Sequence, residues 1–317
     1  MTIGELGFDF NYIIDEDRQE YHNFCLHHLR AQGRPPVDEV WHYTTAEGLI
    51  AILQSGKMFS TQVTCLNDSR EQRYFGDLVY DAAKPLIDSN TGPDFGVFLR
   101  IAEDALIKRD FATAWHFVTC FSENGDDLGQ WRGYGGGECG YAIGFRCDGL
   151  LETLKARPSA MFLPMQYAAS SHKAVVDDVL RMGQIYFRAG IIKRNVTDIE
   201  RWAREFLIAL TWQLDIFASI TKHPKFVGEM ERRIVTSLQV DEQKNLEFRQ
   251  KRTLLARHLP IDLASEVDGV RRLPISRICT GPSPAQRVTQ VSVTDLLLKF
   301  GYENIPIDLS AVPYRLP

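Results

Sequence analysis

The stretch 40–61 constrains the fold of this 317-residue chain more than any other part of its sequence. It opens with a short β-like run, after which Thr44 is followed three residues later by Glu47. A threonine and a glutamate at this spacing form a capping box, which predicts that a helix begins here. Apolar residues at helical spacing follow over 49–53, and Gly56 suits the left-handed residue that ends a helix. Because another β-like run comes next, we predict a strand, a helix and a second strand in succession.

Two polar ring side chains stand where the first strand meets the helix. His42 and Tyr43 come directly before Thr44. The first amides of a helix have no partners within the helix, and they favour negatively charged groups. An imidazole and a phenol beside these amides therefore indicate a binding place for a polar ligand that carries phosphates.

The composition is that of an ordinary globular protein, with 44% hydrophobic and 24% charged residues. A net charge of −5 gives no strong basic footprint for duplex DNA. The most apolar window, 206–220, is interrupted by Gln213 and Asp215 and is too short to cross a bilayer, so we expect no membrane partner. The first residues do not resemble a secretion signal, and the six cysteines show no close pairing. Both features indicate a cytoplasmic protein with reduced thiols.

Hydrophobic periodicity predicts both helices and strands along the rest of the chain. Helices are expected over 15–32, from 67 or 68 onward, and over 97–109, 148–157, 175–188, 198–220 and the later part of 282–299. Strands are expected over 115–122, 141–145, 160–167 and 305–309, and around Ile234, Phe248, Ile261 and Ile275. We divide the chain into an N-terminal helical segment, 1–36, and a single α+β domain, 37–317.

A glycine-rich passage, 133–140, contains Gly-x-Gly-x-x-Gly. A dinucleotide-binding fold requires this pattern after a strand and at the start of a helix. Here the following segment, 141–145, is β-like, so we predict a loop or tight turn instead. Trp131 and Tyr134 are the nearest aromatic residues. Either can stack on a flat ligand ring, although aromatic residues in such positions more often belong to a core.

Glu229, Glu231 and Arg233 follow one another at every second position. On a strand this spacing points all three side chains to the same face. One interpretation is a charged outer face, in which arginine pairs with the glutamates. The other is a pair of carboxylates at a functional site.

Two levels of family resemblance bear on these choices. A strand with His-x-Thr at 42–44, before a helix that ends in Ile-Leu-x-x-Gly, resembles the first motif of the ADP-ribosyltransferase superfamily. The chain as a whole is similar to a widespread bacterial family that is catalogued only as a domain of unknown function. The segments that carry this similarity are 67–71, 120–122, 130–134, 140–145, 229–234, 278–282 and 313–315.

The resemblance implies an α+β fold with a split, bent antiparallel β core decorated by helices. It implies NAD as the substrate, with His42 at the adenosine ribose. A Glu-x-Glu pair on a strand recurs in that superfamily, which places Glu231 at the nicotinamide ribose and Glu229 at the acceptor, although the reverse assignment stays open. The other residues expected at NAD are Tyr43, Thr44, Ser122, Trp131 and Tyr134. A substrate-binding or structural role is expected for Asn67, Asp68, Arg233 and Arg315.

The function expected from the resemblance is transfer of ADP-ribose from NAD to a protein or nucleic-acid acceptor, or hydrolysis of NAD, in a setting such as bacterial defence. Two alternatives stay open. A non-catalytic ligand-sensing or interaction module of the same fold requires that Arg233 or Arg315 neutralise both glutamates. A nuclease requires a metal ion at Asp68 and Glu71, but we find no residues at metal-ligand spacing and predict no metal site.

Overall fold

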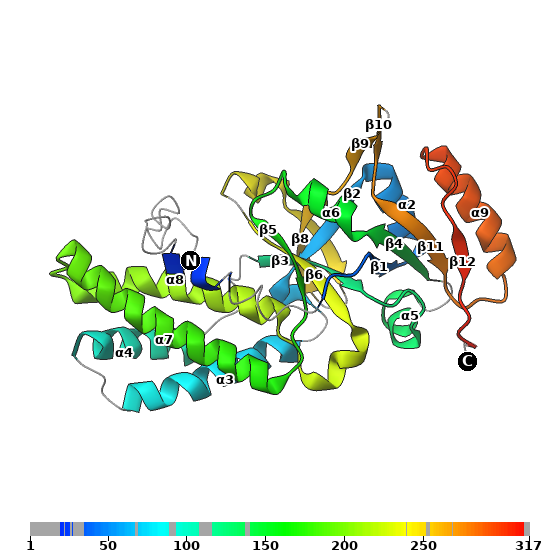
Figure 1. The fold of residues 1–317 in the computed structure, drawn as a ribbon. Coiled ribbons are helices and arrows are strands. Elements are labelled where there is room, and N and C mark those ends of the chain that lie inside the picture. The colour runs from blue at the N-terminus through cyan, green and yellow to red at the C-terminus, as the bar shows by residue number, and fades with distance from the viewer. Residues whose placement is uncertain are drawn as a thin grey trace.

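A computed structural model describes residues 20, 21, 23–25, 27, 35–66, 69–88, 93–107, 116–136, 140–238, 240–251, 254–267 and 269–313. Its centre is a ten-stranded sheet (Figure 1), in which the order β12-β11-β4-β1-β3-β2-β8-β7 is extended by β6 on β3 and β5 on β6. The strands are β1 (Glu39–Thr44), β2 (Lys57–Gln62), β3 (His116–Ser122), β4 (Tyr141–Arg146), β5 (Ala160–Pro164), β6 (Glu231–Ser237), β7 (Glu247–Lys251), β8 (Leu254–Asp262), β11 (Ile275–Thr280) and β12 (Ile307–Leu309). A separate two-stranded ribbon consists of β9 (Ser265–Val267) and β10 (Val270–Arg272).

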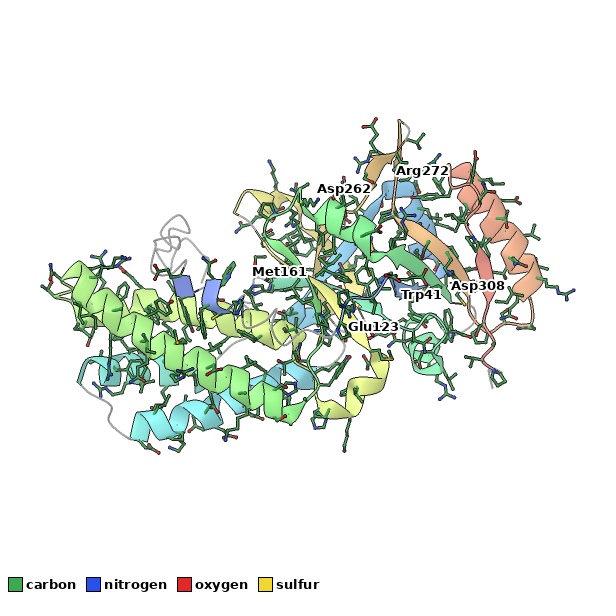
Figure 2. The ribbon with its side chains drawn as sticks, viewed as in Figure 1. Trp41, Glu123, Met161, Asp262, Arg272 and Asp308 are labelled. Carbon is green, nitrogen blue, oxygen red and sulfur yellow. The ribbon has the colours of Figure 1, made fainter. Side chains whose placement is uncertain are left out.

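The sheet diverges between β1 and β3. β1 pairs with β4 over six residue pairs, whereas within the described residues it pairs with β3 only at Trp41 and Ser122. β3 pairs instead with β6, over seven residue pairs. The side chains of Trp41 on β1 and Glu123 just after β3 mark this region in Figure 2. Strands and helices in one unit confirm the prediction of an α+β protein.

The stretch 40–61 forms β1, α2 (Ala46–Ser55) and β2 as predicted, but its cap lies one residue later. Thr45, and not Thr44, is the N-cap, because Thr44 is the last residue of β1. The Thr45 hydroxyl accepts the amide of Gly48 at 3.3 Å. Gly56 ends the helix with a φ of 66°, as its position in the sequence predicts.

Four helices pack together beside the sheet: α3 (Ser69–Asp88), α4 (Pro93–Ile107), α7 (Ala169–Arg194) and α8 (Ile199–Ile220) (Figure 1). Their shared core is rich in phenylalanine, and Tyr21 from the N-terminal segment is fully buried in it. The Tyr21 hydroxyl donates to the carbonyl of Val179 at 2.9 Å. Most of the predicted helix over 15–32 lies outside the described residues.

A second core lies on the other face of the sheet, under α2, α6 (Cys147–Leu154) and α9 (Gln286–Lys299). Val235 packs in the first core and Ile234 in the second, so β6 is covered on both faces. The described residues also form three 3₁₀ helices, η3 (Val63–Cys65), η5 (Pro224–Glu229) and η6 (Val240–Asn245). Among the described helices, none combines the length and apolar character needed to cross a membrane.

The helix α5 (Leu128–Tyr134) was not predicted, and part of it overlaps the glycine-rich passage. It begins at Asp127, whose side chain accepts the amide of Gln130 at 2.9 Å. After the helix, the backbone folds so tightly that a Cβ added to Gly140 would lie 2.5 Å from the Cα of Gly135. Gly135 and Gly140 are therefore in close contact, while Gly133 and Tyr134 belong to α5 and not to a loop. Residues 137–139 lie outside the described residues.

Candidate functional site

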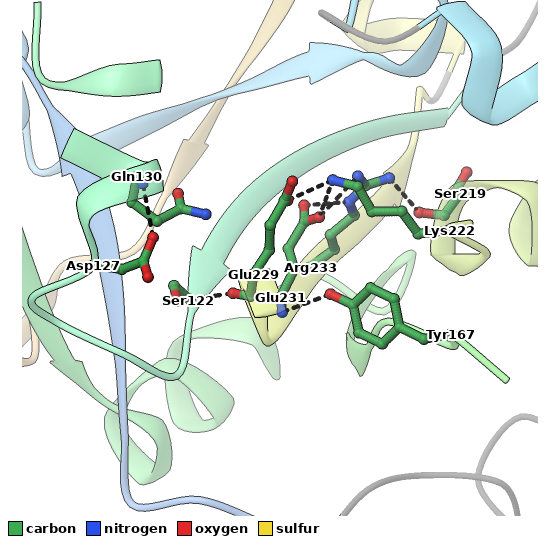
Figure 3. Close-up of polar contacts among 9 residues, drawn as sticks. All are labelled: Ser122, Asp127, Gln130, Tyr167, Ser219, Lys222, Glu229, Glu231 and Arg233. Atoms are coloured by element: carbon green, nitrogen blue, oxygen red, sulfur yellow. Dashed lines mark hydrogen bonds and ion pairs between the residues drawn. The ribbon is translucent and has the colours of Figure 1, made fainter. Parts of the chain in front are cut away.

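The candidate site lies where β3 and β6 run side by side. In this antiparallel pair Ser122 is opposite Glu231 and Cys120 is opposite Arg233. Glu231 and Arg233 are two apart on β6 and share a face, as predicted. The Nε and Nη2 atoms of Arg233 donate to the Glu231 carboxylate at 2.6 and 3.2 Å (Figure 3). Glu231 is 5% exposed and Arg233 is 2% exposed, so this is a buried ion pair.

A lysine that the sequence analysis did not identify joins the two glutamates. Lys222 follows α8 and is 5% exposed. Its Nζ atom donates to the carboxylate of Glu229 at 2.6 Å and to that of Glu231 at 3.0 Å. With Arg233, the cluster contains two carboxylates and two cations in contact, so its formal charges balance.

Glu229 does not lie on the strand, contrary to the prediction that three alternating side chains share one strand face. It ends η5, and Met230 follows in the left-handed conformation, with a φ of 46°, before β6 begins at Glu231. The chain turns at Met230, so the Glu229 carboxylate meets the cluster through Lys222. The Glu229 side chain is 29% exposed and that of Glu231 is 7% exposed. Glu229 is therefore the carboxylate more accessible to a ligand.

Backbone contacts fix the start of β6. The amide of Glu231 donates to the hydroxyl of Tyr167 at 2.9 Å, and its carbonyl accepts the amide of Met165 at 3.0 Å. Arg233 also donates to the carbonyl of Ser219 at 2.8 Å (Figure 3). These bonds come from the segments after β5 and from the end of α8, so the position of Glu231 depends on both layers of the protein.

The charge state of Glu231 follows from these neighbours. Burial on its own raises the pKa of a carboxyl group. Here the charges of Arg233 and Lys222, with hydrogen bonds from Arg233 and Cys120, outweigh that effect and lower the pKa to about 2. Glu231 is therefore ionised at neutral pH.

Cys120 links the carboxylate cluster to the first strand. Its side chain is hydrogen-bonded to Glu231, and its carbonyl oxygen lies 2.9 Å from Nδ1 of His42. Because a carbonyl only accepts, the Nδ1–H of His42 is the donor. Burial lowers the pKa of His42, although this hydrogen bond offsets part of the effect. Burial also raises the pKa of the Cys120 thiol well above its usual range, so Cys120 is protonated and is not a thiolate nucleophile.

Tyr134, the last residue of α5, faces the same cluster. Burial, followed by the nearby groups of Cys120, Glu231 and Glu229, raises the pKa of its hydroxyl to about 12, while the charge of Lys222 opposes the increase. The residue is nevertheless 44% exposed, so the hydroxyl lies toward the cluster while part of the side chain faces solvent. Side chains from β1, β3, α5 and β6 therefore meet around Cys120.

Tyr43 and Trp131, which were both expected at NAD, contact each other in a small aromatic core. Their rings meet edge to face, with centroids 4.6 Å apart. The Tyr43 hydroxyl donates to the carbonyl of Asn124 at 2.8 Å and accepts the amide of Asp127 at 3.0 Å. The indole N–H of Trp131 donates to Asp126 at 2.7 Å. These contacts fix the turn before α5, so both aromatic residues hold that helix in place.

Ser122 and Thr44 also make local contacts. The Ser122 hydroxyl donates to the carbonyl of Glu229 at 2.9 Å and accepts the amide of Asn124 at 3.1 Å. It thus connects the end of β3 to the turn that presents Glu229. Thr44 lies against α2, where a Cβ added to Gly48 would come within 2.0 Å of its hydroxyl oxygen.

The remaining predicted residues cannot be placed with the cluster. Asn67, Asp68 and Arg315 lie outside the described residues, as does the side chain of Glu71. Within the described part of the chain, no three or more His, Cys, Asp or Glu residues are grouped so that they could hold a metal ion.

Three contributions to the site were not predicted from the sequence, namely those of Lys222, Cys120 and Gln130. Lys222 is the first charged residue after the most apolar part of α8, and a lysine in that position is a signal of an internal ion pair. Cys120 offered no such signal, because its role depends on strand pairing. Gln130 lies in a helix whose existence the glycine-rich composition obscured.

Comparison with known proteins finds a family model that matches part of this chain. Residues 130–234 match the family model described as "Protein of unknown function (DUF2971)". The match begins in α5 and ends in β6, so it includes Tyr134 and the whole Glu229, Glu231 and Arg233 group. It confirms, for this part of the chain, the predicted similarity to an uncharacterised family. No curated protein and no solved structure matches the chain.

Proposed function

We propose that this protein binds NAD beside β3 and transfers ADP-ribose to a macromolecular acceptor or to water. The observation that carries the proposal is the meeting of distant segments at Cys120. His42 bonds to its carbonyl, Glu231 bonds to its thiol, and Tyr134 is close enough for the charge of Glu231 to act on its hydroxyl. An imidazole, a phenol and a carboxylate are the groups that the resemblance to ADP-ribosyltransferases implies at an NAD site.

The reaction needs a fixed negative group near the sugar. The bond between C1′ of the ribose and the pyridinium nitrogen breaks, and its electron pair leaves with nicotinamide. Positive charge develops on the ribose, as in glycoside hydrolysis. The acceptor oxygen or nitrogen then bonds to C1′ and releases its proton. A carboxylate that is already in place stabilises the cationic transition state without reorganising.

The two glutamates suit different parts of this reaction. Glu231 is buried, ionised and held in place by Arg233 and Lys222, so it suits the stabilisation of positive charge that develops on a nearby ribose. Glu229 is more exposed, and it suits the entry side, where an acceptor loses its proton. Because the two cations balance the two carboxylates, the site does not repel an anionic dinucleotide.

Glu229→Gln is the variant that tests the proposal. We expect release of nicotinamide from NAD to fall about 100-fold, which is typical when a general base is removed. The partly exposed position of Glu229 predicts only a small change in melting temperature. The matched control is Glu242→Gln. Glu242 is a partly buried carboxylate outside the cluster, with a side chain that is 17% exposed, and it forms an ion pair with Arg157 at an N–O distance of 2.5 Å. The control should retain wild-type nicotinamide release.

The proposal fails if the wild-type protein shows no NAD binding by calorimetry and no nicotinamide release with any acceptor from a cell extract. It also fails if Glu229→Gln, like the control Glu242→Gln, releases nicotinamide at the wild-type rate.

One observation favours the alternative of a non-catalytic ligand-sensing module. Arg233 and Lys222 already pair with Glu231, which is what a structural ion network requires. This alternative predicts that NAD or another nucleotide binds to the wild-type protein while no nicotinamide is released. Calorimetry combined with the release assay separates the two functions.

A further inference from the structure

The side-chain amide of a largely buried glutamine faces the carboxylate cluster without a partner among the described residues. Gln130 lies in the first turn of α5 and is 9% exposed. Its backbone amide donates to Asp127 at 2.9 Å. Its side-chain amide has no hydrogen bond to any described residue. The amide atoms are not among the buried groups that lack a partner in the described residues, so they reach solvent although most of the side chain is covered. The side chain of Gln130 is thus available to a ligand.

The geometry of α5 directs this amide toward the site. Gln130 and Tyr134 are four residues apart on the helix, so they share a face. The Tyr134 hydroxyl is near enough to Glu231 and Glu229 for their charges to raise its pKa, which indicates that this face of the helix is the one toward the cluster. Trp131 points instead into the small aromatic core. Figure 3 shows the Gln130 side chain extending from α5 on the side where Glu229 lies.

We propose that Gln130 recognises the carboxamide of the nicotinamide ring, an assignment that rests on the proposed function. A primary amide offers one acceptor and two donors, so it forms two hydrogen bonds with a second primary amide. A ligand that carries a carboxylate in place of the carboxamide offers acceptors alone. It also brings a third negative charge close to Glu229 and Glu231. Gln130 therefore selects dinucleotides with a carboxamide over those with a carboxylate.

An adenine edge also presents a donor beside an acceptor, and glutamine pairs with it in other settings. The position of the glutamates decides between the two ends of NAD. Glu229 and Glu231 act at the nicotinamide ribose in the proposed reaction, and the Gln130 face of α5 is turned toward them. The adenosine end is expected at His42, on the other side of β3.

The test compares three ligands by calorimetry: NAD, nicotinic acid adenine dinucleotide, and nicotinamide hypoxanthine dinucleotide. The wild-type protein should bind NAD at least tenfold more tightly than the nicotinic acid form. Gln130→Met has a similar length and no hydrogen-bonding amide, so NAD affinity should fall about tenfold and the preference for the carboxamide should largely disappear. The loss of affinity on replacing adenine by hypoxanthine should be the same in the wild-type protein and in Gln130→Met. Gln54→Met, at an exposed position of α2, is the matched control and should behave as wild type.

Equal affinity of the wild-type protein for NAD and the nicotinic acid form overturns the inference, even if Gln130→Met fails to fold. An unchanged preference in a folded Gln130→Met variant also overturns it, while the proposed function stands. A Gln130-dependent preference without nicotinamide release supports the inference and leaves the transferase activity refuted. No binding of any of the three dinucleotides refutes both.

Discussion

The low pKa of Glu231 makes a measurable contribution to stability. A carboxyl group in an unfolded chain has a pKa of about 4.3, and the folded value here is about 2. A depressed pKa stabilises the folded state above the unfolded pKa, and this stabilisation is lost as the pH falls through the folded value. The difference corresponds to about 3 kcal/mol at neutral pH, of which roughly half is lost by pH 3.

Glu231→Gln removes this titration and leaves two buried cations with fewer partners. Arg233 loses its carboxylate and Lys222 retains Glu229. Removing one member of a buried ion pair typically costs about 3–5 kcal/mol. We therefore expect a loss of that size at pH 7. The gap between the two proteins should narrow by between about 1 and 2 kcal/mol on acidification to pH 3, because only the wild-type protein loses the Glu231 contribution.

Urea unfolding at pH 7, 5, 4 and 3, followed by circular dichroism, measures this gap. Other carboxyl groups titrate in both proteins and cancel in the difference. Glu242→Gln is again the control for loss of an ion pair elsewhere, and its cost should be smaller because both partners are partly exposed. A gap that stays constant from pH 7 to pH 3, or a loss below 1 kcal/mol at pH 7, contradicts the proposed charge network.

Two further predictions concern the segments that hold the cluster in place. Gly140→Ala should destabilise the protein by about 1–3 kcal/mol, because its Cβ would lie 2.5 Å from the Cα of Gly135. The control Gly133→Ala meets nothing within 4 Å and should be neutral or stabilising by up to about 1 kcal/mol. Melting curves of the two variants measure the difference. Ser122→Ala removes the hydrogen bond from the Ser122 hydroxyl to the carbonyl of Glu229, so we expect a stability loss of about 1 kcal/mol and slower nicotinamide release. Unchanged release would show that this hydrogen bond does not position Glu229.

Local sequence patterns predicted the elements whose signals are local. The cap, the apolar face and Gly56 are adjacent in the sequence, and α2 formed within one residue of the expected start. The error at Glu229 has a specific cause. Met230 adopts a left-handed backbone, which non-glycine residues rarely do, so alternation of side chains could not reveal the turn. The helix α5 was missed because seven residues with two glycines give little helical periodicity.

The contacts that define the site could not be read from spacing, because they join distant segments. Cys120 meets Glu231 only through the pairing of β3 with β6, and His42 meets Cys120 only where β1 approaches β3. Lys222 is close to Glu229 in sequence, but its contact with both glutamates depends on η5 and on the turn at Met230.

The same geometry determines which residues can distinguish an enzyme from a silent module. The pairing of Glu231 with Arg233 and Lys222 is common to both, so a variant at Glu231 mainly reports on folding. Glu229, Gln130 and Tyr134 carry different information, because Glu229 and Tyr134 are partly exposed and the Gln130 amide has no partner among the described residues. If a nicotinamide ring lies between α5 and the carboxylates, changes at Gln130 alter which dinucleotide binds, whereas changes at Glu229 alter whether the bound dinucleotide reacts. A binding module would respond to the first change and remain silent to the second.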